Sequence, residues 1–144
     1  MKATLFGILI GILAIILIAL SKGFDKRTLY GLTLTGIGFL YVGFTWSDPL
    51  SLTINIFQAL AFVFISCYGI NRSIVVLIAG YLLHGAWDLG YSYLPLPALR
   101  PPHYDLFCLA VDFTMGLYLM VLQRIAPNIG PSFENSSVNI KGKS

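Results

Sequence analysis

Residues 81–93 read YLLHGAWDLGYSY and place a histidine and an aspartate inside an otherwise apolar run. On a helix, His84 and Asp88 occupy the same face one turn apart, and Trp87 borders that face. An aspartate near the middle of a membrane helix costs about 2.5–3.5 kcal/mol on insertion scales. The stretch therefore predicts a membrane helix whose polar face is turned toward other parts of the protein and away from lipid.

The composition around this stretch is that of a chain surrounded by lipid. Of its 144 residues, 57% are hydrophobic and 10% are charged, and the mean hydropathy is +0.82. Soluble domains carry roughly 25% charged residues, so this chain has too few charges to cover a globular surface. The net charge of +3 rests on few residues and forms no aromatic-rich basic patch. We therefore expect the lipid bilayer as a partner, and no nucleic acid.

Five hydrophobic runs have lengths near the ~20 residues needed to cross a bilayer. They cover residues 3–20, 29–46, 50–70, 73–94 and 104–123. Short connections between most of the runs favour antiparallel neighbours. We expect an all-α fold in which residues 1–126 form one bundle of five transmembrane helices. Residues 127–144 are polar and lack helical periodicity, which predicts a disordered cytoplasmic tail.

The first run has a second interpretation as a cleaved signal peptide, because residues 19–21 (ALS) fit a small-x-small cleavage site. The run is long for that role, and a basic cluster that resists translocation follows at Lys22, Lys26 and Arg27. We therefore expect the first helix to be retained. Its Gly7 and Gly11 form a GxxxG motif, for which we expect a role in helix packing within the monomer.

The distribution of lysine and arginine predicts how the bundle is oriented. With the N-terminus outside, only Lys2 and Arg100 lie on the outer side. The other basic residues lie inside: Lys22, Lys26, Arg27, Arg72, Arg124, Lys141 and Lys143. By the positive-inside rule, this bias predicts an outer N-terminus and an inner C-terminus.

Polar side chains from three of the predicted helices fall at similar depths. Counted from the outer boundary at ~1.5 Å per residue, His84 lies ~15 Å deep, Asp88 ~9 Å and Asp112 ~12 Å. The third run adds Asn55 at ~8 Å and Gln58 at ~12 Å. The sequence therefore predicts one polar site in the outer half of the membrane, opening outward beneath the connection PLPALRPPH.

The candidates for ligand binding or proton handling lie in this layer or border it. They are His84, Trp87, Asp88, Asp112, Cys108, Asn55 and Gln58. No catalytic role can be assigned, because the chain contains neither HExxH nor GxSxG. One histidine with two aspartates could hold a divalent metal, but the runs contain no second histidine. We therefore assign no metal ligand and leave any cofactor unknown.

Other aromatic and histidine residues have ordinary explanations. We expect the interfacial belt to contain Trp46, Tyr81, Tyr91, Tyr93 and Tyr104. We expect His103, beside Tyr104, to lie in a solvated loop.

Three kinds of function fit these residues. The first is the binding or transport of a proton or a small polar ligand, since histidine titrates near neutral pH. The second is a membrane enzyme acting on a lipid-like substrate, with His84 as a general base beside Asp88 or Asp112. The third is an accessory subunit whose polar cluster only fixes helix register, at about 0.6 kcal/mol for each hydrogen bond. A functional site is favoured over the third kind, because the polar network costs more than packing requires. The depth of the site and its titratable chemistry favour the first kind.

The segments GYLLHGAWDL (80–89) and CLAVD (108–112), joined through a proline-bearing loop, resemble a family of small bacterial integral membrane proteins of unknown function. The resemblance covers most of the hydrophobic chain and implies a location in the bacterial plasma membrane. It also implies that the family pattern includes His84, Trp87, Asp88, Cys108 and Asp112.

This sequence departs from the family pattern at one place. Members of the family often add histidines one turn after the WD pair, where this chain has Tyr91 and Ser92. The departure weakens any metal site that would need those histidines.

Overall fold

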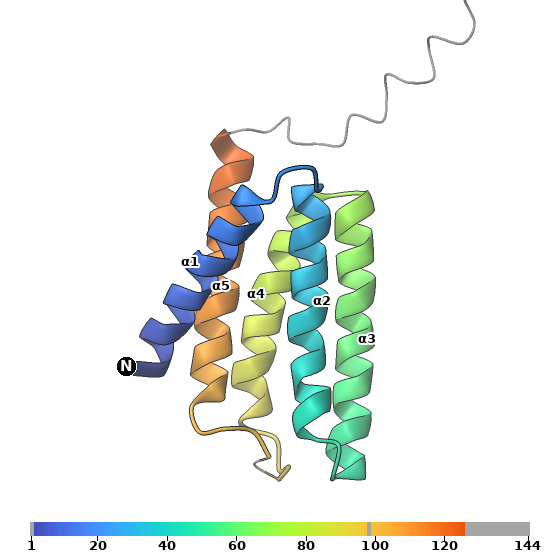
Figure 1. The fold of residues 1–144 in the computed structure, drawn as a ribbon. Coiled ribbons are helices and arrows are strands. Elements are labelled where there is room, and N and C mark those ends of the chain that lie inside the picture. Colours follow the sequence, from blue (N-terminus) through green and yellow to red (C-terminus); the bar gives the residue numbers. More distant parts are fainter. Residues whose placement is uncertain (1, 98, 126–144) are drawn as a thin grey trace, which may run out of the picture.

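The computed structural model describes residues 2–97 and 99–125, and all regular structure in this part of the chain is helical. The helices are α1 (Lys2–Leu20), α2 (Lys26–Phe44), α3 (Pro49–Asn71), α4 (Ile74–Tyr91) and α5 (Tyr104–Ile125). Successive helices run in opposite directions, and their connections alternate between the two ends of the bundle (Figure 1). The expected all-α bundle is therefore confirmed. The predicted tail, residues 127–144, lies outside the described residues.

A capping aspartate sets the start of α2. The carboxylate of Asp25 accepts hydrogen bonds from the backbone nitrogen of Thr28 at 2.8 Å and from its hydroxyl at 2.6 Å. These bonds hold the pKa of the Asp25 carboxyl below its usual range. The helix consequently begins at Lys26, three residues before the start of the predicted run at residue 29. It ends at Phe44, two residues before the predicted end at residue 46. Buried Arg27 is accommodated because its Nε donates to the carbonyl of Gly69 at 2.9 Å.

Similar local signals fix the start of α3 and the end of α4. Asp48 accepts from the backbone nitrogen of Ser51 at 2.8 Å, and Pro49 occupies the first turn, where its missing N–H is no loss. Helix α4 ends at Tyr91, three residues before the predicted end at 94. A turn replaces the last part of the predicted helix, and the backbone nitrogen of Ser92 bonds to a carbonyl only three residues back.

Helix α5 packs between α1 and α4, and α4 in turn contacts α3 and α2 (Figure 1). Glycines allow the close approach of α1 to α5. A Cβ at Gly7 would overlap the carbonyl oxygen of Phe107, and one at Gly11 would lie 2.9 Å from Cβ of Thr114. The GxxxG motif of the first helix thus packs against another helix of the same chain, as expected.

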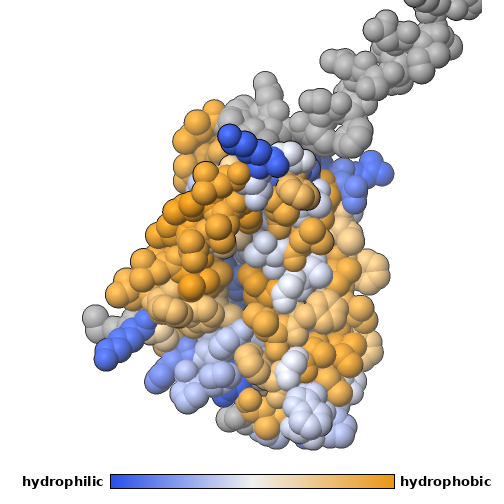
Figure 2. Space-filling view, in the orientation of Figure 1, coloured by the Kyte–Doolittle hydropathy of each residue, from blue (hydrophilic) through white to orange (hydrophobic). Residues whose placement is uncertain are grey.

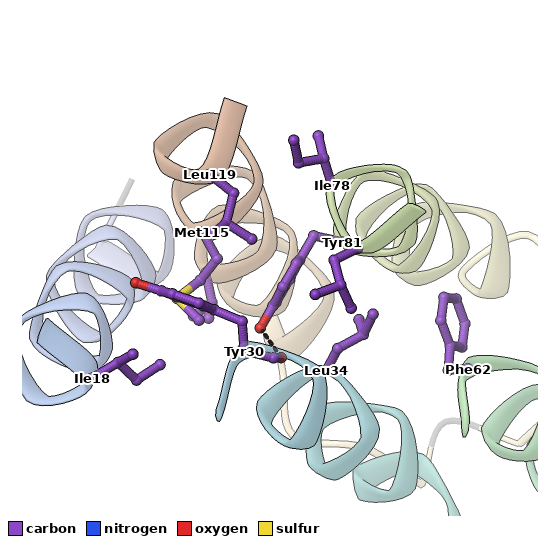
Figure 3. Close-up of a cluster of buried hydrophobic side chains, with 10 residues drawn as sticks. Ile18, Tyr30, Leu34, Phe62, Ile78, Tyr81, Met115 and Leu119 are labelled. Atoms are coloured by element: carbon purple, nitrogen blue, oxygen red, sulfur yellow. Dashed lines mark hydrogen bonds between the residues drawn. The ribbon is translucent and has the colours of Figure 1, made fainter. Parts of the chain in front are cut away.

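A buried apolar cluster joins all five helices in the half of the bundle nearer the α1–α2 and α3–α4 connections (Figure 3). Its members are Ile18, Tyr30, Leu34, Phe62, Leu77, Ile78, Tyr81, Val111, Met115 and Leu119. The hydroxyl of Tyr81 donates to the carbonyl of Tyr30 at 2.7 Å. The expectation that Tyr81 belongs to an interfacial belt is therefore wrong, because its hydroxyl finds a backbone acceptor inside the bundle.

The outer surface of the bundle is apolar over most of its height. Figure 2 shows hydrophobic residues over the middle of one face and hydrophilic residues toward the two ends. Among the described residues, α1, α3, α4 and α5 are each long and apolar enough to cross a membrane. Helix α2 does not reach that level; it opens on Lys26 and Arg27 and is rich in threonine and glycine. By length and composition, these four helices are those of a membrane protein.

We predict that Gly7→Ala lowers the stability of the bundle and that Gly36→Ala does not. The new Cβ at position 7 would meet the backbone of α5, whereas nothing lies within 4 Å of one at position 36. Overpacking costs about 1–3 kcal/mol, while replacing glycine by alanine at an open helical position gains up to ~1 kcal/mol. Thermal unfolding in detergent, followed by circular dichroism, should give a lower midpoint for Gly7→Ala alone. Equal midpoints for the two variants would contradict the described packing of α1 on α5.

Candidate functional site

Three ionisable side chains meet between α4 and α5. Nδ1 of His84 lies 2.8 Å from Oδ2 of Asp112 and 3.5 Å from Oδ2 of Asp88. All three residues are 0% exposed. We call this group, in which one nitrogen faces two carboxylates, the buried triad. Its existence confirms the convergence that the spacing on α4 and the depths along α4 and α5 predicted.

The two helices approach closely where the triad forms. Gly85, next to His84, faces α5, and a Cβ there would lie 3.0 Å from Cδ1 of Leu109. On α5, a Cβ at Gly116, one turn beyond Asp112, would lie 3.3 Å from a side-chain carbon of α4. Small residues on both helices therefore allow side chains as short as aspartate to reach the histidine. His84 lies seven residues before the end of α4, about 10 Å along the axis.

Most polar atoms of the buried triad have no hydrogen-bond partner among the described residues. These atoms are Nε2 of His84, Oδ1 and Oδ2 of Asp88, and Oδ1 of Asp112. On another side, the ring of Phe62 packs edge-on against His84 with a centroid distance of 4.7 Å. Buried polar groups in proteins are nearly always hydrogen-bonded, and an unpaired buried charge is costly. The protein groups alone thus leave the triad with unmet charge and hydrogen-bonding capacity.

Asn55 and Gln58 are buried as the depth estimate predicted, but they do not bond to the buried triad. The Nδ2 of Asn55 donates to the hydroxyl of Thr45 at 3.2 Å and to that of Tyr91 at 3.1 Å. Both amide atoms of Gln58 lack a partner in the described part of the chain, and its side chain lies against α2 at Gly38. The third helix therefore contributes a neighbouring polar layer and no direct member of the triad.

Trp87 and Cys108 lie beside the buried triad. Trp87 is half-buried, and its indole ring lies 6.1 Å from the ring of Tyr91. Cys108, one turn before Asp112 on α5, is 2% exposed. Within the described residues, neither side chain forms a hydrogen bond to the triad. Both residues belong to the sequence pattern of the family that this chain resembles, and both lie close to the triad. Their part in the site stays a prediction.

Two tyrosines near the site were missed by the sequence analysis. Tyr91 was expected in the interfacial belt, but it is 4% exposed, and its ring packs against that of fully buried Tyr41 at 5.0 Å. The hydroxyl of Tyr41 is buried and has no hydrogen-bond partner among the described residues. The sequence carried a signal for Tyr91, which falls at the i+7 position from His84 and so on the same helix face. The sequence carried no such signal for Tyr41, because α2 has no charged residue near Tyr41 whose spacing could mark a polar face.

The α4–α5 connection covers the end of the bundle nearest the triad. Nη2 of Arg100 donates to the hydroxyl of Ser92 at 2.8 Å and lies 3.8 Å from Oδ2 of Asp105. The Arg100 guanidinium also stands 5.2 Å above the ring of Tyr91. The triad is fully buried, and this contact network lies at that end of the bundle. The outward opening beneath the connection stays a prediction.

A groove of about 390 Å³ runs along the outside of α3 and α4. Its lining is almost entirely apolar and consists of Ile54, Phe57, Gln58, Ala61, Phe62 and Trp87. Phe62 belongs both to this groove and to the contact with His84. One aromatic ring therefore lies between the surface groove and the buried triad.

We predict that His84→Asn destabilises the protein and that His103→Asn does not. The first change leaves two buried carboxylates without their shared partner, and breaking such a buried pair costs about 3–5 kcal/mol. His103 is exposed and has a φ of 60°, a conformation that asparagine tolerates. Thermal unfolding of the two variants in the same detergent measures the difference. A His84→Asn protein as stable as the His103→Asn protein would show that the His84 contacts do not hold α4 to α5.

Residues 2–125 match a protein family described as a family of unknown function, DUF6010. No curated protein and no solved structure matches the chain. The match covers all five helices and confirms the resemblance inferred from the segments GYLLHGAWDL and CLAVD. This chain therefore belongs to the DUF6010 family of unknown function.

Proposed function

We propose that this chain is a five-span protein of the bacterial plasma membrane whose buried triad binds or transports a proton or small polar ligand from the outer side. The observation that carries the proposal is the position of His84 Nδ1, 2.8 Å and 3.5 Å from two carboxylates that are 0% exposed. Ionisable residues at membrane depth are costly, and they commonly mark ion pathways or proton relays. Histidine also changes its charge near neutral pH.

The proposal counts α2 as a fifth span, although it is less apolar than the others. Its 19 residues equal the length of α1 and correspond to about 28 Å. Large apolar residues still form part of its exposed side, including Leu32, Phe39 and Leu40. Its neighbours α3 and α4 cover the opposite side. These features support a helix that spans the bilayer with one face toward lipid.

The orientation is supported by the positions of the basic residues. Lys22, Lys26 and Arg27 lie in or next to the α1–α2 connection, Arg72 lies in the α3–α4 connection, and Arg124 lies in the last turn of α5. These positions share one end of the bundle, and the buried triad lies nearer the other end (Figure 1). With the basic end inside, the triad falls in the outer half of the membrane.

We predict that a reporter fused after Ser144 is found in the cytoplasm. A fluorescent protein at this position should fold and emit, because it faces the cytoplasm, whereas alkaline phosphatase should be inactive there. The same two reporters placed before Met1 should show the opposite pattern, provided that they are exported by the first helix. Active phosphatase at the C-terminal position would contradict an inner C-terminus.

A membrane enzyme acting on a lipid-like substrate is the second candidate. The groove along α3 and α4 favours it, because Phe62 both lines this apolar groove and packs against His84. In this candidate His84 is the general base, with Asp112 as the group that orients it at 2.8 Å. Such an enzyme needs no net movement of protons across the bilayer, and neither does an accessory subunit.

Proton flux into liposomes tests the first candidate. We predict that vesicles containing the wild-type protein acidify faster than vesicles containing Asp112→Asn when a potassium gradient with valinomycin drives proton entry. Asp105→Asn is the control, because this half-exposed carboxylate lies outside the triad and bonds to Ser92. A trapped pH-sensitive dye reports the rate. Equal rates for wild type and a well-folded Asp112→Asn protein would contradict proton transport through the triad.

A further inference from the structure

We propose that the buried triad binds a divalent transition-metal ion, with Nδ1 of His84 and one carboxylate oxygen each from Asp88 and Asp112 as ligands. This inference rests on the proposed function, in that both require the triad to be a binding site. It goes further by naming the chemical class of the ligand.

The distances within the triad suit a small metal ion. Zinc bound tetrahedrally at about 2.0–2.1 Å from nitrogen and oxygen places its ligand atoms ~3.3 Å apart. The two distances from Nδ1 of His84 to the carboxylates, 2.8 and 3.5 Å, lie on either side of this value. One ligand atom from each of the three residues lies within 4.8 Å of the other two. The carboxylates can rotate about their broad terminal torsions to bring their oxygens closer together.

The charge of the triad favours a dication over a proton alone. With both ring nitrogens protonated, His84 would donate its Nδ1–H to Oδ2 of Asp112 at 2.8 Å, and the imidazolium charge would offset one negative charge. Asp88 would then stay buried at 0% exposure, with no protein hydrogen bond to either oxygen from the described residues. A divalent ion beside neutral imidazole offsets both carboxylates at once, which removes the cost of an unpaired buried charge.

The donor atoms indicate which metals fit. Imidazole nitrogen suits zinc, iron, copper and nickel, while carboxylate oxygen also suits manganese and magnesium. One nitrogen with two carboxylates therefore fits a first-row ion such as Zn²⁺ or Fe²⁺. Three protein ligands leave a position for water or a further ligand, as in catalytic zinc sites. Because the ligands must be deprotonated, metal binding at this site releases protons, which connects it to the proton handling proposed above.

Cobalt and zinc binding to the full chain in detergent tests the inference. After treatment with a chelator, the wild-type protein should bind one Co²⁺ per chain and develop the visible absorption of a tetrahedral site, and Zn²⁺ should displace the cobalt. Asp88→Asn and Asp112→Asn should each weaken binding more than about 100-fold, since loss of an outer-shell partner alone costs about 10–100-fold. His103→Asn and Asp105→Asn should bind as the wild type does.

Asp88→Asn keeps the test decisive if other variants fail to fold. This substitution removes a buried carboxylate that has no protein hydrogen bond among the described residues. The thermal unfolding midpoint of the metal-free variant should therefore equal or exceed that of the wild type. Added Zn²⁺ should raise the midpoint of the wild type, because a ligand of the folded state stabilises it. The midpoint of Asp88→Asn should not move.

Two results would overturn the metal site: no stoichiometric Co²⁺ or Zn²⁺ binding by the wild type, or binding by Asp88→Asn and Asp112→Asn with the affinity of the wild type. The liposome experiment separates this failure from failure of the proposed function. If the wild type binds no metal while Asp112→Asn still slows proton flux, the metal inference is wrong and proton handling stands. If the metal binds and Asp112→Asn leaves flux unchanged, the metal site stands and transport is wrong.

Discussion

The contact of His84 with two carboxylates is the constraint on which the arrangement of this bundle depends. Lipid offers no hydrogen bonds to a carboxylate, so Asp88 and Asp112 need a partner inside the protein. That need turns one face of α4 toward one face of α5, and Gly85 allows the two helices to come close. Helix α1 then packs on the other side of α5 through Gly7.

The interior of the bundle is divided into a polar half and an apolar half. Along α4, the apolar residues Leu77 and Ile78 and the internally bonded Tyr81 come before His84. Along α5, which runs the other way, Met115 and Leu119 follow Asp112 toward the same end. Dispersion and close packing hold the apolar half together, although Arg27 Nη2 lies buried near that end without a partner among the described residues. The other half contains the buried triad, whose hydrogen-bonding needs the described residues do not fully meet.

Proton handling, metal binding and general-base catalysis place related demands on the same donor atoms. Each needs a nitrogen of His84 and carboxylates that ionise inside the membrane. They differ in what reaches the triad and from where. The Arg100 contacts lie at the end of the bundle nearest the triad, and Phe62 lies between the triad and the groove on α3 and α4.

The sequence by itself determined the fold class and the membership of the triad. Apolar runs near 20 residues predict spanning helices, the four-residue spacing of His84 and Asp88 places them on one face, and counting depths brings Asp112 to their level. The hydropathy of the sequence did not determine where α2 and α4 begin and end. A capping aspartate and a turn set those ends, and hydropathy is insensitive to both.

Only the tertiary structure decided how the polar layer is divided and closed. Asn55 bonds to Thr45 and Tyr91 and not to the triad, since hydrogen-bond partners are set by the rotation of α3 about its axis, which depth does not specify. Tyr41 packs against Tyr91 from α2, where no spacing pattern marks it. Tyr81 and Tyr91 are buried because backbone and amide partners satisfy their hydroxyls inside the bundle. Composition near a helix end cannot distinguish such tyrosines from those of an interfacial belt.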